Sequence, residues 1–214
     1  MARVVVLRGG EVRDALAAAD RVAADGDVGV VLAACEGEAV LLGAHQRRAS
    51  ALRDASGVVL RRATGGVAIA AGAGTVYAAL LLPEPSAIVP CAMDRFLNRH
   101  VRGVLKALTK LGAPAQYFGR DVVSVLHRPV AWVGWDRAAS GACRMEMVIG
   151  VDRAFVLPAS MCGYGDRERP AFGGKTGITW VEAAAAMGST ASARELTERL
   201  LDRLAEALVS VPTS

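Results

Sequence analysis

Lysine and aromatic residues are scarce in this sequence. Only Lys106, Lys110 and Lys175 are lysines, and aromatic residues make up 5% of the chain. A hydrophobic content of 53% is nevertheless ample for a sizeable core, which must consist mainly of valine, leucine and alanine. The net charge of +4 suits an acidic partner protein or a nucleotide. Without a basic run interleaved with aromatic residues, the sequence does not predict a nucleic-acid partner.

Metal-ligand spacing and membrane segments are also missing. The four cysteines, Cys35, Cys91, Cys143 and Cys162, form no CxxC pair, and no histidine cluster accompanies them, so we expect no metal site. The first residues, MARVVVLRGGEV, lack the apolar core of a signal peptide, and no apolar run is long enough to span a bilayer. These absences predict a cytoplasmic protein with reduced thiols and no membrane partner.

The pattern along the chain predicts one α+β domain over residues 1–214. Short β-branched or apolar runs predict strands at 3–7, 28–33, 40–42, 58–60, 76–82, 121–126, 130–133 and 145–151. Apolar residues at helical spacing predict helices over 11–24, 94–111 and 179–187, and a last helix that Ser192 and Glu195 open as a capping box. We expect Asp94 to cap the helix predicted over 94–111, and Gly112 to end that helix.

The stretch LRRATGGVAIAAGAGTVYAALLL, residues 60–82, is the most informative part of the sequence. It reads as a strand, a tight turn at Gly65 and Gly66, and a second strand that pairs with the first as a hairpin. At Gly65 we expect either a positive φ or the close approach of a ligand. Backbone N–H groups beside Arg61 and Arg62 would suit an anion such as a phosphate. An ordinary hairpin with a solvated arginine pair is the alternative.

RRATGG resembles the RRx(S/T)GG signature of the lipoate–protein ligase, octanoyltransferase and biotin–protein ligase superfamily. Four further segments are similar to that family in the family's own order: VLLGAHQ at 40–46, GRDVV at 119–123, RPVAWVGWDR at 128–137 and GITWV at 177–181. The resemblance covers roughly residues 38–185. It implies the α+β fold of class-II biotin and lipoate ligases, a mixed, mainly antiparallel sheet flanked by helices.

The resemblance also implies a reaction, in which an acyl group is passed to a lysine of a small carrier protein. Lipoate or octanoate is the implied substrate, with ATP and Mg²⁺ if the chain is a ligase, and a lipoyl carrier protein or domain is the implied partner. No residues remain for the accessory domain of many lipoate ligases, so a separate accessory subunit is a further implied partner. The implied substrate- or nucleotide-binding residues are Gln46, Arg61, Arg62, Thr64, Gly65, Gly66, Val67, Ala68, Asp121, Val130 and Ala131.

Several positions depart from the family pattern. The catalytic lysine falls on Pro129, and the glycine that follows it falls on Trp132. The third glycine of the signature is Val67. The later His-Asp pair is Ala71-Gly72, and the His-Gly pair is Met145-Glu146. Proline has no side-chain donor for an acyl carbonyl or a phosphate, so the fold resemblance is stronger than the catalytic one.

Three residues are candidates to replace the missing lysine or to carry the acyl group. Arg128 offers a positive charge but cannot act as a general base, because its guanidinium stays protonated. Lys175, in the glycine-rich segment 173–175, is a candidate for the role of the lysine, and an ordinary lysine of a surface loop is the alternative. Cys143 lies near the position of the acyl-carrying cysteine of octanoyltransferases, beside Arg144, which would lower its pKa. The alternative for Cys143 is a small buried filler. For Asp121 a metal or ribose ligand and a turn cap remain open, and Trp132 either narrows the acyl tunnel or belongs to the core.

Two functions follow from the resemblance. The first is the transfer or attachment of lipoate or octanoate to lipoyl carrier proteins. The second is a catalytically inactive relative that binds an acyl or nucleotide ligand, or serves as a partner subunit. The retained RRATGG motif and Cys143 favour the first, and the absent lysine favours the second.

Overall fold

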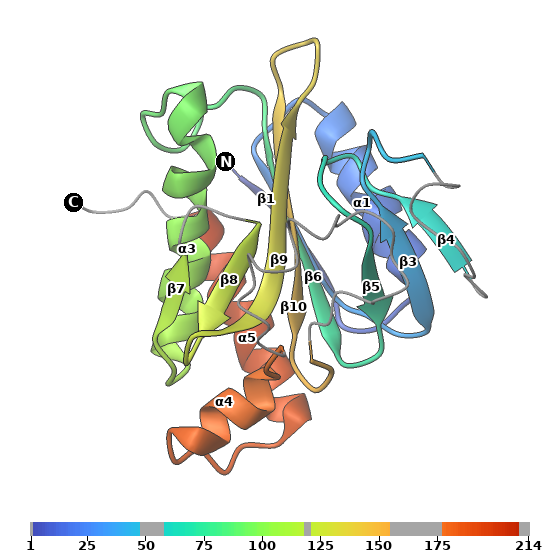
Figure 1. Ribbon diagram of the computed structural model, residues 1–214. Helices are drawn as coiled ribbons and strands as arrows, with labels where there is room; N and C mark the ends of the chain where they lie inside the picture. The colour runs from blue at the N-terminus through green and yellow to red at the C-terminus, as the bar shows by residue number, and fades with distance from the viewer. Residues whose placement is uncertain (1, 48–57, 118–120, 155–176, 210–214) are drawn as a thin grey trace.

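A seven-stranded sheet forms the centre of the computed structural model, which describes residues 2–47, 58–117, 121–154 and 177–209 (Figure 1). The strand order is β1-β2-β6-β10-β9-β8-β7, and only β1 and β2 are parallel. The mixed, mainly antiparallel sheet predicted from the sequence is therefore confirmed. The strands are β1 (Arg3–Leu7), β2 (Gly29–Ala34), β6 (Thr75–Leu82), β7 (Ala115–Tyr117), β8 (Val122–Val125), β9 (Arg128–Arg137) and β10 (Cys143–Gly150).

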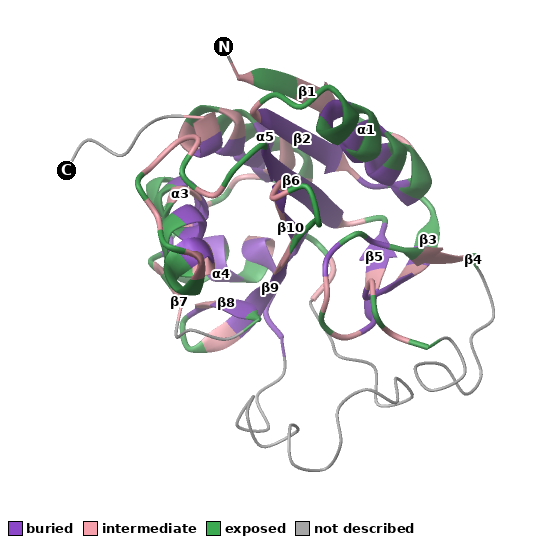
Figure 2. Cartoon of the chain, turned by 90° about the horizontal axis from the view of Figure 1, so that it is seen from above, coloured by how far each residue is buried: buried purple, intermediate pink, exposed green. Residues whose placement is uncertain are grey.

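A second, three-stranded sheet lies against one face of the large one. Its order is β4-β3-β5, with β3 (Glu38–Leu42) parallel to β4 (Val58–Arg61) and antiparallel to β5 (Ile69–Gly72). Helix α1 (Val12–Ala24) packs on the same face of the large sheet, against β2 and β6. The other face is covered by α3 (Phe96–Lys110), which follows the 3₁₀ turn η1 (Met93–Arg95), and by α4 (Trp180–Ala186) and α5 (Ala193–Val209). Figure 2 shows the buried strands between these two layers. No helix in the described ranges is long and apolar enough to cross a membrane.

Strand alternation divides the interior into two cores. Along β10, Cys143, Met145 and Met147 contribute to the core beneath α3 and α5. Val148 contributes to the other core, beneath α1 and the small sheet. Because side chains alternate along a strand, Glu146 points to that second side. A fully buried carboxylate thus faces the small sheet, where the RRATGG motif lies.

The predicted hairpin of residues 58–60 with 76–82 is wrong. β4 pairs with β3 in the small sheet, whereas β6 lies between β2 and β10 in the large one. The short β5 lies between them in the chain and pairs with β3. Short apolar runs carry no mark of which strand they pair with, so neighbours in sequence looked like neighbours in space.

Helix ends follow the sequence with one exception. Ser192 and Glu195 form the predicted capping box, in which the Ser192 amide donates to Glu195 Oε2 at 2.8 Å and the Glu195 amide to Ser192 Oγ at 3.3 Å. Gly112 follows α3 with a φ of +111°, as expected of a helix-ending glycine. Asp94 does not cap α3, because the chain first makes the turn η1 and the N-cap is Arg95.

We expect a stabilising substitution at the turn between β8 and β9. Leu126 and His127 form this two-residue turn with φ values of +50° and +59°, a conformation that costs an L residue roughly 1–2 kcal/mol. Asn-Gly is the pair that such turns favour. Leu126→Asn with His127→Gly should therefore raise the free energy of unfolding in urea by about 1–2 kcal/mol. Replacing both residues by alanine should give no such gain, and equal stability of the two variants would contradict the strain.

Candidate functional site

Arg62 is the buried centre of the RRATGG segment, whose residues 62–66 we term the signature loop. Its side chain is 1% exposed and its guanidinium lies 4.0 Å from the centre of the Trp132 ring. Nη1 donates to the carbonyl of Leu41 at 2.8 Å and Nη2 to that of Gly65 at 2.8 Å. Arg62 thus joins β3, β9 and the loop, and its guanidinium faces protein groups rather than an external anion.

Arg61 holds the neighbouring loop, residues 43–46, in the same way. Its Nη1 donates to the carbonyls of Gly43, Ala44 and Gln46 at 2.8, 3.0 and 2.7 Å. Gln46 in turn accepts from the Gly43 amide through Oε1 at 3.1 Å. The two predicted anion-binding arginines and Gln46 therefore form one network that fixes two loops side by side.

Gly66, not Gly65, is the position of the signature loop at which the backbone favours glycine. Gly66 has a φ of +93°, and a Cβ there would come within 3.3 Å of the Trp132 ring. Gly65 has no such φ, and a Cβ there would meet only ordinary contacts with Asp136 and His45 at 3.8 Å. A Cβ on Gly43 would collide with the carbonyl of Gly66, so the two loops also need glycine for their close approach.

Glu146 binds the signature loop from the large sheet. The carboxylate is completely buried; Oε2 accepts from the Thr64 amide at 2.9 Å and Oε1 from the Tyr77 hydroxyl at 2.6 Å. Arg144 Nη1 lies 3.8 Å from Oε1 and compensates part of the charge. Burial and the adjacent Glu146 carboxylate raise the pKa of Tyr77 well above its usual value, so the hydroxyl stays a donor.

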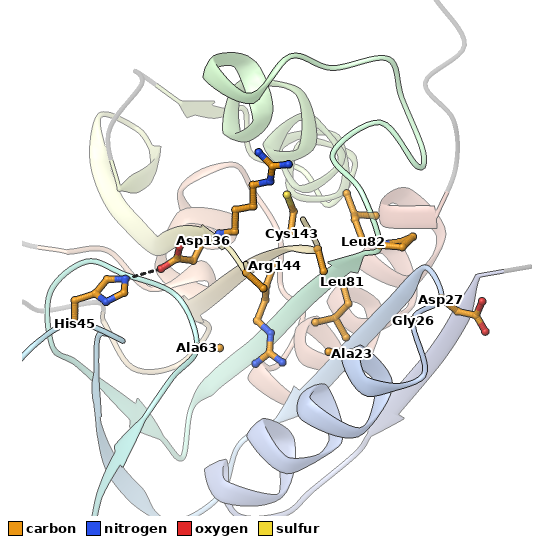
Figure 3. Close-up of a pocket in the computed structure, with 14 residues that line it drawn as sticks. Ala23, Gly26, Asp27, His45, Ala63, Leu81, Leu82, Asp136, Cys143 and Arg144 are labelled. Atoms are coloured by element: carbon orange, nitrogen blue, oxygen red, sulfur yellow. Dashed lines mark hydrogen bonds and ion pairs between the residues drawn. The ribbon is translucent and has the colours of Figure 1, made fainter. Parts of the chain in front are cut away.

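A cavity of about 340 Å³ opens beside this loop (Figure 3). Its walls come from the end of α1, the end of β6, the β9–β10 hairpin and the loops that carry His45 and Ala63. Most of the wall is apolar, and the charged groups are Asp27, Asp136, Arg137 and Arg144. The lining residues are Ala23, Gly26, Asp27, His45, Ala63, Leu81, Leu82, Pro83, Asp136, Arg137, Ala138, Ala142, Cys143 and Arg144.

Two polar side-chain pairs border the cavity. His45 Nε2 lies 2.9 Å from Asp136 Oδ2, with the histidine side chain 80% exposed. Arg144 donates to Asp20 Oδ1 at 2.8 Å while its own side chain is only 13% exposed. The histidine therefore lies on the outer edge of the cavity, and Arg144 forms part of its inner wall.

Cys143 and Arg128, two predicted catalytic residues, lie far apart. Cys143 pairs with Arg137 across the β9–β10 hairpin, nine residues along β9 from Arg128. At about 3.3 Å a residue the separation is roughly 30 Å. Arg128 donates to the carbonyl of Gly177 at 2.6 Å, at the end of β9 away from the cavity. The structure does not bring these two residues into one site.

Cys143 lines the cavity but its sulfur belongs to the helix side. Its side chain is packed in the core under α3 and α5, and Figure 3 shows it pointing away from Arg144. Burial raises the pKa of the Cys143 thiol, against the opposing effect of Arg137. The adjacent Arg144, expected to lower this pKa, points to the other face of the sheet.

The other predicted site residues that the structure describes do not line the cavity. Thr64, Ala68, Val130 and Ala131 are buried in the protein interior, and Val67 packs against the core under the small sheet. Asp121 is exposed just before β8, where its carbonyl accepts from the Val133 amide at 3.0 Å. Lys175 lies outside the described residues. No group of three or more metal-ligating side chains occurs in the described ranges.

The sequence pointed least to the residues that organise the site. Glu146 stood out only as a departure from the family His-Gly pair, and Tyr77 and Asp136 had no local signal at all. Trp132, which the sequence predicts at the position of a family glycine, is fully buried, and its ring lies 3.3 Å from where a Cβ on Gly66 would be. Its size was the available signal, because an indole in place of a glycine must fill what the glycine leaves open.

Comparison with solved structures decides the fold. Plasmodium falciparum LipL1 in complex with lipoate matches with a TM-score of 0.70 over 100% of this chain and 64% of its own, at 12% identity. The bipartite lipoate protein ligase system of Thermoplasma acidophilum matches with a TM-score of 0.65 over 97% of this chain and 83% of its own, at 14% identity. The chain has the fold of the lipoate protein ligases. A lipoate-protein ligase A bound with ATP matches over 97% of this chain and 85% of its own, with a TM-score of 0.64 and 15% identity.

The likeness to the lipoate-ligase fold is structural. Biotin protein ligases match as well, with a TM-score of 0.50 for the protein of Leishmania major. No protein-family model matches the sequence, and no curated protein does. The class-II ligase-like α+β fold expected from RRATGG and its companion segments is confirmed.

Removal of the Glu146 carboxylate should release the signature loop. Glu146→Ala leaves the Thr64 amide and the Tyr77 hydroxyl without their acceptor, and should lower the free energy of unfolding in urea by about 2–5 kcal/mol. Glu146→Gln keeps one acceptor oxygen and should cost clearly less. Glu206→Ala, at an exposed position of α5, is the control and should change stability by no more than about 0.5 kcal/mol. A loss at Glu146 no larger than that of the control would contradict this role.

Proposed function

We propose that the protein binds the acyl group of lipoate or octanoate and serves the acylation of lipoyl carrier proteins as a binding subunit. The observation that carries the proposal is the apolar cavity beside Ala63 of the signature loop, within the lipoate-ligase fold. Its volume of about 340 Å³ is at the lower end of the range of roughly 300–1,000 Å³ typical of small-molecule sites. A short acyl chain suits this size and lining.

The polar groups of the cavity suit the head of an acyl ligand. Arg144 and Arg137 line the wall, and a guanidinium stabilises a carboxylate or a carbonyl oxygen. The exposed His45 adds a further donor at the edge. An acyl chain against Leu81, Leu82 and Pro83 would thus direct its head toward these cations.

The described residues support binding better than adenylation. Pro129 stands in place of the family lysine, and the only described lysines, Lys106 and Lys110, lie on α3. Arg61 and Arg62 donate to backbone carbonyls of the protein, whereas the sequence had predicted that they face a phosphate. The proposal therefore includes no ATP-dependent step by these residues. We propose that a separate chain supplies the chemistry; the Thermoplasma ligase to which this chain is similar is itself bipartite.

A tryptophan in the cavity should abolish acyl binding. Ala23 and Ala24 are adjacent exposed residues at the end of α1, and only Ala23 lines the cavity. Ala23→Trp should weaken octanoate and lipoate binding in calorimetry by at least about tenfold, or 1.4 kcal/mol. Ala24→Trp, the matched control, should bind as the wild type does, and both variants should melt normally. Wild-type protein that binds neither acid, or equal binding by both variants, would sink the proposal.

Acyl transfer through Cys143 is the second candidate, because Cys143 lines the same cavity. Burial raises the pKa of both thiols, but Cys143 is buried whereas Cys91 is half-buried, so we expect iodoacetamide to label Cys143 more slowly than Cys91. Peptide mass spectrometry measures both rates in one sample. Faster labelling of Cys143, with loss of octanoyl transfer to a lipoyl domain in Cys143→Ser, would establish the transferase instead.

A further inference from the structure

Five exposed cations form a row along α3 and the residue before it, and α3 itself carries no acid. Arg95 precedes the helix, and Arg99, Arg102, Lys106 and Lys110 follow at intervals of three or four residues. At 100° per residue all five fall within roughly 80° of the helix circumference, in a row about 22 Å long. We term this row the α3 basic face. The opposite side of the helix, with Phe96, Val104 and Leu108, is buried.

The other long helices do not share this arrangement. α1 alternates Arg13 and Arg21 with Asp14 and Asp20, and α5 mixes three arginines with four acids. Several arginines elsewhere have ion-pair partners, as in Arg3–Asp25, Arg144–Asp20 and Arg203–Glu206. In the α3 basic face, Arg95 pairs with Asp94 at 3.4 Å. The other four cations of the face form no ion pair with any described residue.

Packing does not account for the α3 basic face. Like charges three or four residues apart destabilise a helix, and among the described residues only the Arg95–Asp94 pair compensates the row. An uncompensated row of this length is instead an attractive surface for a complementary negative one, which it would steer into contact.

The chemistry of the face favours an acidic protein over other polyanions. None of the exposed large hydrophobic residues of the described chain lies on α3, so nothing there would insert into a membrane. No exposed aromatic side chain interrupts the row to stack on bases, and the net charge of the whole chain is only +4. A straight row of separate cations matches a row of aspartate and glutamate side chains on a folded domain.

We propose that the α3 basic face binds an acidic carrier domain and holds it beside the acyl cavity. The N-terminal end of α3, whose outer side carries this face, is anchored near that cavity: its buried Phe96 stacks on Trp135 of β9 at 5.1 Å, and the following Asp136 and Arg137 line the cavity wall. The identity of the occupant as the carrier rests on the proposed function, whereas its acidic character rests on α3 alone.

Charge reversal on α3 tests this surface. The probe is an unlipoylated lipoyl domain of net negative charge, titrated into the full-length protein by calorimetry at 50 and 300 mM NaCl. The test variant is Arg99→Glu, Arg102→Glu, Lys106→Glu. The control is Arg13→Glu, Arg194→Glu, Arg199→Glu, which makes the same change in net charge at exposed positions of α1 and α5.

We expect the wild type and the control to bind the domain within a factor of about two of each other, and more weakly at high salt. The test variant should bind at least about tenfold more weakly while keeping its octanoate affinity and melting temperature. The docking surface alone would be overturned if both variants lost the same affinity for the lipoyl domain. It would also be overturned if the wild type bound octanoate but not the domain. Preference for an RNA duplex or for vesicles of anionic lipid over the domain would overturn it too. If the wild type does not bind octanoate, the proposed acyl site is overturned, whereas the domain titration still decides the docking surface on α3.

Discussion

The buried guanidinium of Arg62 is the contact on which the arrangement of the site depends. Burying a charge is costly unless the protein supplies partners for it, and Arg62 has two backbone carbonyls and the face of Trp132. Those partners come from β3, from the signature loop and from β9, so the small sheet cannot move relative to the large one without exposing or orphaning the cation. Glu146 applies the same constraint from β10.

These constraints give the RRATGG segment a structural role even though the sequence predicts Pro129 at the position of the family's catalytic lysine. In this chain both arginines of RRATGG satisfy the backbone of neighbouring loops, and Gly66 lets the loop pass close to the Trp132 indole. The motif therefore has a structural task that does not depend on nucleotide chemistry. The cavity remains at the edge of that assembly, between the β9–β10 hairpin and α1.

Local signals in the sequence predicted most of the helices and strands, although not β5 or β7, because capping residues, glycines and apolar periodicity act within a few residues. The capping box at Ser192 and the stripe of α3 are examples. Long-range partners were beyond reach: nothing near Arg62 announces Leu41 or Trp132, and nothing near Thr64 announces Glu146. The pairing of β4 with β3 was missed for the same reason, and so was the distance between Arg128 and Cys143.

The alternation along β10 has a consequence for how this fold can vary. Met145 and Met147 face one core and Glu146 the other, so a one-residue insertion or deletion inside the strand would exchange their sides. A carboxylate would then enter the layer of Val104 and Leu108, and a methionine would replace the acceptor of the signature loop. We therefore expect changes in chain length to be tolerated better at the two ends of β10 than inside it.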